Sequence, residues 1–147
     1  MTSQTRSFDW VTARAACSIG SLFEQLKIQL KDDIDTRQSL AKGPPFYYGF
    51  KYVAENNTVA ALLEGHKLHA SVVFRLRNGV IEVLGADEKV LFTAAATLND
   101  EGECRLKVAD QELELWQFRK RALEHLFFSI PDEYMRSEEN TIYNKNS

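Results

Sequence analysis

The sequence contains few of the residues that indicate a cross-linked or membrane-spanning protein. It has two cysteines in 147 residues, Cys17 and Cys104, without CxxC spacing, and a chain of this length can bury a core without cross-links. We therefore expect two free, buried thiols in a reducing compartment. No run approaches the roughly 18 apolar residues of a membrane-spanning helix, and the polar opening stretch MTSQTRSFDW does not fit a secretory signal. A cytoplasmic protein with no membrane partner is the expectation.

Motifs for catalysis or metal binding are also missing. The sequence has no GxSxG, no glycine-rich phosphate loop and no Cys, His and acid spacing typical of a nucleophile. His66 and His69 form an HxxH, but a strand would place them on opposite faces. The acidic runs at residues 32–35 and 100–103 lack the spacing of a calcium loop. We expect no metal, no cofactor and no catalytic residues, while an enzyme assembled only in three dimensions stays open.

Acidic and basic residues are present in nearly equal numbers. With 18 basic and 21 acidic residues the formal net charge is -3, so no global field attracts nucleic acid or an anionic membrane. A local basic patch could form from four residues of the predicted sheet, namely Arg75, Arg77, Arg105 and Lys107. Glu82 and Glu103 dilute that patch, and we do not expect a nucleic-acid partner.

Apolar residues at three-and-four spacing predict a helix over residues 8–40. They are Val11, Ala15, Ile19, Leu22, Phe23, Leu26, Leu30 and Ile34. Gly20 is expected to weaken or bend this helix. The aspartates in residues 32–35 are expected to fray or break its far end, because negative charge opposes the helix dipole there. Pro44 and Pro45 prevent any continuation.

From residue 46 to about residue 109 the apolar period changes to two, which predicts a meander of about six strands. Turn residues separate the strands at Asn56-Asn57, Gly65-His66, Asn78-Gly79, Gly85 to Glu88 and Asn99 to Glu103. The Asn-Gly pair is the strongest of these signals, because both positions accept a positive φ. The turns predict a register in which the following residues face each other: Phe50 and Leu63, Leu63 and Leu68, Arg77 and Val80, and Val83 and Val90.

The aromatic stretch GPPFYYGFKYV belongs to the inner face in this register. Phe46, Tyr48, Phe50 and Tyr52 share that face, while Tyr47 points the other way. Leaving four such rings in water would forfeit roughly 6 to 12 kcal/mol, which is comparable with the whole net stability of a domain. We therefore predict that these rings form core rather than a stacking platform for nucleobases.

The chain returns to helical spacing over residues 113–130, with Trp116, Leu123 and Phe127 on one stripe. The stretch QELELWQF also alternates and offers a short seventh strand through Leu115. Pro131 is expected to end the helix. Residues 1–130 are expected to form a single domain, and the polar residues 131–147 a mobile tail.

These elements predict an α+β fold in which an antiparallel meander sheet of six to seven strands is packed on one face by an N-terminal and a C-terminal helix. A helix, a curved sheet and a helix in this order resemble helix-grip domains and, more loosely, the small acidic chaperones of bacterial secretion systems. The resemblance is one of topology, and it implies the arrangement of the layers.

The outer face of the predicted sheet is half apolar, which a face exposed only to water would not be. Its candidate partner-binding residues are Val53, Leu62, His69, Val73, Arg75, Leu84 and Leu91. An apolar centre with a polar rim is typical of protein interfaces. We predict a non-enzymatic interaction module that binds a second copy of the chain, as a homodimer, or another protein. The alternative is that the second helix or the tail covers this face.

The inner face carries small residues, which either allow a helix to approach closely or leave a cavity. Close packing is the simpler expectation. If the helices do not fill the space, the sheet would hold a small apolar ligand, as a carrier or an enzyme would. That cavity would be lined by Tyr48, Tyr52, Ala61, Ala70, Phe74, Phe92 and Ala94.

Overall fold

The computed structural model describes residues 7–41 and 48–145, with side chains described to residue 137. The helices are α1 (Trp10–Ala16), α2 (Ile19–Ser39), α3 (Leu115–Glu124), the π-helical turn η1 (His125–Ser129) and α4 (Ile130–Lys145). The strands are β1 (Tyr48–Glu55), β2 (Thr58–Gly65), β3 (Leu68–Arg77), β4 (Val80–Leu84), β5 (Val90–Leu98), β6 (Cys104–Val108) and β7 (Gln111–Leu113).

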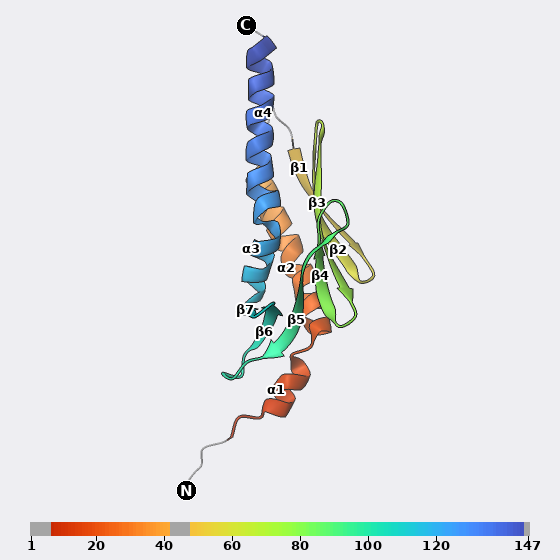
Figure 1. Ribbon diagram of the computed structural model, residues 1–147, viewed down its shortest axis with the longest axis vertical. Helices are drawn as coiled ribbons and strands as arrows, with labels where there is room; N and C mark the ends of the chain where they lie inside the picture. Colours follow the sequence, from red (N-terminus) through yellow and green to blue (C-terminus); the bar gives the residue numbers. More distant parts are fainter. Residues whose placement is uncertain (1–6, 42–47, 146–147) are drawn as a thin grey trace.

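The fold is α+β, as predicted. Seven antiparallel strands form one open sheet in chain order, from β1 to β7. The helices α2 and α3 lie side by side on one face of the sheet, and α3, η1 and α4 follow one another as a continuous rod that extends beyond the strands (Figure 1). The alternating stretch before α3 does supply a seventh strand, which ends at Leu113 rather than Leu115.

Two of the predicted hairpin registers are confirmed. Phe50 faces Leu63 and Arg77 faces Val80. Asn56 (φ 41°), Asn78 (φ 56°) and Gly79 (φ 76°) take the positive φ values that these turns require.

The other two registers are wrong by two residues. Leu63 faces Ala70 instead of Leu68, because Lys67 (φ 58°) rather than Gly65 provides the positive φ and the turn moves one residue along the chain. Val83 faces Phe92 instead of Val90, and an irregularity between Val83 and Leu84 absorbs the difference. Since side chains alternate with a period of two, a shift of two residues leaves the faces of β2, β3 and Phe92 as predicted. Val90 is the exception: it was predicted opposite Val83 on the inner face, but the irregularity pairs it with Leu84 of the outer face, and it is 46% exposed.

The core lies between the sheet and the helices. On α2, Phe23, Leu26 and Leu30 are at most 1% exposed. Phe118 of α3 is fully buried, and its ring centroid lies 5.8 Å from those of Phe74 and Phe92. The helical stripe of α2 and the inner face of the sheet therefore close on each other, as the two periodicities predict.

The aromatic stretch contributes to this core. Tyr48 and Phe50 are buried, and the half-buried Tyr52 packs against the same cluster. Phe46 and Tyr47, which were assigned to the inner and outer faces, lie outside the described residues. For the three described rings, the prediction of core rather than stacking platform is confirmed.

The N-terminal helix differs from the prediction because it is broken at Cys17 and Ser18, ahead of Gly20. Each half has its own N-cap. Asp9 accepts a hydrogen bond from the Thr12 amide, and Ser18 accepts one from the Ser21 amide. Hydrogen bonds from the Thr12 hydroxyl and amide also hold the pKa of Asp9 below its ordinary value. The two caps explain why one apolar stripe forms two helices.

The predicted fraying at residues 32–35 does not occur, and α2 continues to Ser39. Lys31 lies 3.3 Å from Asp35 one turn away, and Arg119 of α3 lies 2.5 Å from Asp33. These cations offset the negative charge that would oppose the helix dipole.

The prediction that the C-terminal helix ends at Pro131 is wrong, because α4 continues to Lys145. Proline has no amide hydrogen to donate to the carbonyl four residues earlier, which here is that of Phe127. The π-helical turn just before Pro131 adjusts the backbone, and the Phe127 carbonyl accepts a hydrogen bond of 2.7 Å from Arg37 Nε instead. The backbone of residues 131–145 is therefore helical, while the mobility predicted for this segment stays a prediction.

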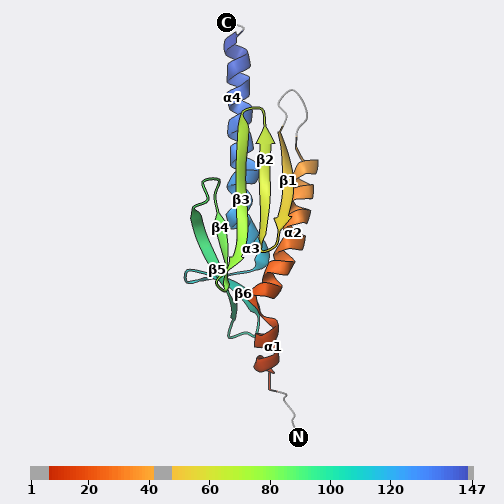
Figure 2. The same ribbon diagram turned by 90° about the vertical axis from the view of Figure 1, so that its right-hand side faces the viewer.

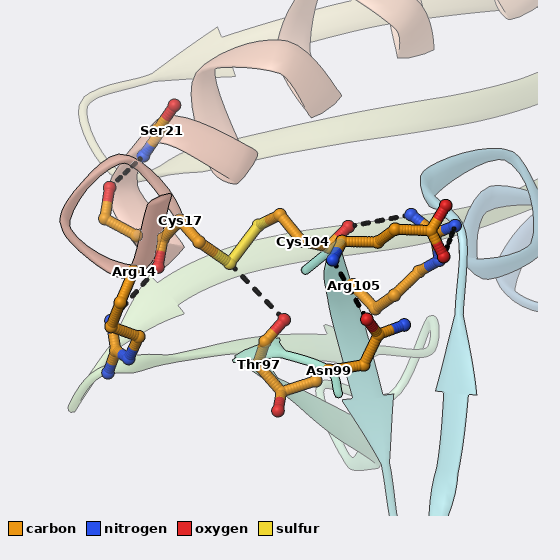
Figure 3. Close-up of a disulfide and its surroundings, with 9 residues drawn as sticks. Arg14, Cys17, Ser21, Thr97, Asn99, Cys104 and Arg105 are labelled. Carbon is orange, nitrogen blue, oxygen red and sulfur yellow. Dashed lines mark hydrogen bonds and ion pairs between the residues drawn. A yellow bond between two sulfur atoms is a disulfide. The ribbon is translucent and has the colours of Figure 1, made fainter. Parts of the chain in front are cut away.

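The prediction of free thiols is also wrong, because Cys17 and Cys104 form a disulfide with a Cα–Cα distance of 5.4 Å. The break between α1 and α2 brings Cys17 beside the first residue of β6, and Cys17 Sγ lies 3.4 Å from the Thr97 carbonyl oxygen (Figure 3). The bond ties the start of the helical layer to the far part of the sheet. Within the described ranges, no helix has the length and apolar character needed to cross a membrane.

Candidate functional site

The outer face of the sheet carries no helix in the part of the chain that the structure describes. Figure 2 shows this face toward the viewer, with β1 to β5 in front and with α3 and α4 behind them. The alternative in which the second helix or the tail covers this face is therefore wrong for the described backbone, because α3 and α4 lie behind the sheet.

An apolar row crosses this face from strand to strand. Val53 faces Ala60, Ala60 faces Val73, Val73 faces Leu84, and Leu84 faces Val90. We call these five residues the outer row. The predicted registers of Phe50 with Leu63 and of Arg77 with Val80 imply the pairs Val53 with Ala60 and Val73 with Leu84, and the corrected register of β2 and β3 joins the two pairs into one continuous row.

The ends of the outer row are open and its middle is shielded. Val53 is 40% exposed and Val90 46%, whereas Ala60 and Leu84 are 7% and 4% exposed. Leu91, next to Val90, is 58% exposed. Four strand spacings of about 4.8 Å separate the two ends, so the exposed apolar ends lie roughly 19 Å apart.

Charged residues border the outer row on both sides and are paired with one another. On one side Glu82 Oε1 lies 2.8 Å from Arg75 Nε and 3.7 Å from Arg77 Nε. On the other side Glu64 lies 3.5 Å from Lys51 and 3.8 Å from His69. Leu62, which faces Lys51 and Ser71, lies between the outer row and the pair formed by Glu64 and His69. The rim is polar, and each of these charged groups has a partner within the chain, although Arg75 and Arg77 share one carboxylate.

The basic patch considered from the sequence is partly neutralised. Arg75 and Arg77 share the Glu82 carboxylate, and Arg105 lies 2.9 Å from Glu103, while Lys107 forms no ion pair with the side chains that the structure describes. An anion would have to compete with these carboxylates for the guanidinium groups, and the arrangement does not favour nucleic acid.

The residues predicted to line an inner cavity lie in the core. Ala61, Phe74 and Ala94 are at most 1% exposed, and the other four are buried or packed against the same cluster. Side chains of α2 and α3, above all Phe118, occupy the space that a ligand would need. The hollow described next is lined by different residues, so the geometry gives the cavity alternative no support.

A groove that the sequence did not predict runs along the seam between α2 and the α3–η1 segment, with a volume of about 410 Å³. We call it the helix groove. Its lining residues are Asp33, Thr36, Arg37, Leu40, Trp116, Arg119, Lys120, Leu123, Glu124, Phe127 and Phe128. Three of its large apolar side chains are more than half exposed, namely Leu40 at 61% and Trp116 and Phe128 at 52% each.

Arg37 is the unusual residue of the helix groove, because it is only 7% exposed. Its guanidinium carbon lies 4.8 Å from the ring centroid of Phe50, 5.1 Å from that of Phe128 and 5.6 Å from that of Tyr48. One signal in the sequence could have identified it: residues 23, 26, 30, 34 and 37 continue one three-and-four stripe, so an arginine stands where the spacing places a core residue.

Among residues 7–41 and 48–137, no group of three or more His, Cys, Asp or Glu side chains could hold a metal ion. Comparisons of the chain with protein-family models, with curated proteins and with solved structures find no match. The outer row and the helix groove are thus the two features on which a functional proposal can rest.

Proposed function

We propose that this protein is an interaction module that self-associates through the outer face of its sheet. The observation that carries the proposal is the outer row, an apolar line across five strands on a face without a helix. Its border of charged residues resembles the polar rim around the apolar centre of a protein interface. Both properties were expected from the sequence, and the corrected register strengthens the first of them.

A second copy of the chain fits this surface better than a partner of opposite charge. In a two-fold interface each surface patch meets itself. An axis through Val73, the middle member of the outer row, would place the exposed Val53 of one copy over the exposed Val90 and Leu91 of the other. The rim charges are paired within the chain, so they do not require a complementary charge from outside.

The disulfide bears on where such a module would work. Disulfides persist in oxidising compartments and are rare in the reducing cytosol. The bond between Cys17 and Cys104 therefore favours an oxidising compartment over the cytoplasmic location expected from the sequence.

Charge placed at the ends of the outer row is expected to weaken self-association. In Val53→Asp and Leu91→Asp, a carboxylate would replace a side chain that is 40% or 58% exposed in the single chain, so folding should survive. A carboxylate buried in the interface would cost at least 1.4 kcal/mol, which is about a tenfold increase in the dimer dissociation constant. Sedimentation equilibrium over a series of concentrations measures that constant.

Ile28→Asp is the matched control, because Ile28 is 67% exposed on α2 and lies away from the outer face. Its dissociation constant should equal that of the unaltered protein. A protein that stays monomeric at its highest soluble concentration, or a control as impaired as the two variants, would refute the proposal.

A further inference from the structure

The helix groove contains a buried positive charge without a carboxylate partner. Arg37 Nε donates to the Phe127 carbonyl at 2.7 Å, and Nη2 donates to the Tyr48 hydroxyl at 3.2 Å. Within residues 7–41 and 48–137, no carboxylate lies within ion-pair distance of this guanidinium. A guanidinium has five N–H donors, and a buried cation is normally balanced by an anion.

The backbone break explains only one part of this arrangement. The missing amide of Pro131 leaves the Phe127 carbonyl free, and Arg37 Nε satisfies it. A neutral donor would serve that purpose at a lower desolvation cost. The charge of Arg37 and the donors of Nη1 are not accounted for by this role, and Arg37 lines the groove.

The other charges of the groove are balanced locally. Arg119 bonds to Asp33 at 2.5 Å and also to Gln29. Lys120 lies 3.0 Å from Glu124. The unbalanced charge in the groove is therefore that of Arg37, which selects a ligand with one negative group.

The apolar walls of the groove indicate that the remainder of the ligand is apolar. Leu40, Trp116 and Phe128 are each more than half exposed, and Leu123 and Phe127 complete an apolar lining. A volume of about 410 Å³ falls in the range typical of sites for small molecules, which are mostly apolar with a few polar groups that orient the ligand.

We propose that the helix groove binds a small amphiphile with one carboxylate and an apolar body. The carboxylate would accept hydrogen bonds from the Arg37 guanidinium, and the apolar body would lie against Trp116 and Phe128. This site is separate from the outer row, so its test is independent of self-association.

The proposal can be tested without altering the protein around Arg37, by comparing the binding of two saturated ten-carbon ligands, decanoate and decanol. Trp10 and Trp116 are the two tryptophans of the chain, so Trp10→Phe, at a 62% exposed position on α1, makes Trp116 the sole reporter. Titration with decanoate below its critical micelle concentration is expected to change the Trp116 fluorescence saturably. Decanol, which has the same body without the charge, is expected to bind at least tenfold more weakly.

Two further variants separate the groove from nonspecific apolar binding. Phe128→Ala should raise the decanoate dissociation constant at least threefold, because it removes one wall of the groove. Ile28→Ala, at an exposed apolar position of α2 that does not line the groove, should leave it unchanged. Equal affinity for decanoate and decanol, an absent or unsaturable response, or equal effects of the two variants would overturn the proposal.

Discussion

Phe118→Ala is expected to lower the free energy of unfolding by about 3–5 kcal/mol, the range for removing a buried aromatic ring from a core. Phe118 is fully buried, and its ring is in contact distance of both Phe74 and Phe92. It therefore joins α3 to β3 and β5 at once. Backbone hydrogen bonds hold both the sheet and the α2 helix in place. Neither can therefore move far enough to close the cavity that Phe118→Ala would leave.

Urea denaturation of the variant and of the unaltered protein measures this loss. The slope against denaturant should be unchanged if both remain two-state. Trp116→Ala is the matched control, because Trp116 is an aromatic residue of the same helix that is 52% exposed, and its loss should be about 1 kcal/mol or less. A loss below about 1 kcal/mol for Phe118→Ala would contradict the packing described for α3.

Breaking the disulfide is expected to lower the free energy of unfolding by about 2–4 kcal/mol. Cys17 and Cys104 are 87 residues apart, and closing a loop of that size restricts the unfolded chain by up to about 4.6 kcal/mol in the chain-entropy model. The loss should be seen as a lower melting temperature, either after reduction or in the double variant Cys17→Ser, Cys104→Ser.

The double variant is also the control for reduction, because a reductant should not change its melting temperature. Alkylation of the unfolded, unreduced protein should label neither cysteine until a reductant is added. Labelling of both cysteines without reduction would restore the original expectation of free thiols and remove the reason to favour an oxidising compartment.

The layers and faces of this fold could be predicted from the sequence because the signals are local. The Asn78-Gly79 turn fixes β3 against β4 through two residues that accept positive φ. The turn between β2 and β3 was misplaced because a glycine suggested the wrong position, and Lys67 adopts the positive φ although it bears a side chain. Such conformations cost about 1 kcal/mol, and the pairing of β2 with β3 along eight residue pairs offsets that cost.

The candidate sites depended on contacts between distant residues and were only partly predictable. The outer row could be seen as two separate pairs, and it became continuous only with the correct register of Ala60 and Val73. The helix groove arises where α2 meets α3, about 90 residues later in the chain, and no spacing within either helix reveals it. The same is true of the disulfide, whose partners come together only because α1 and α2 are separated at Cys17.

The disulfide also determines how the chain would respond to a mechanical force. Tension applied to the two ends of the protein would bypass every residue between Cys17 and Cys104, because the bond carries the load across 5.4 Å. Strands β1 to β5 lie within this bypassed loop, whereas β6, which begins at Cys104, and β7 follow it. Stretched in an optical trap, the oxidised chain should be shorter at full extension than the reduced chain by roughly 300 Å, at about 3.4 Å for each of the 87 residue steps between the two cysteines.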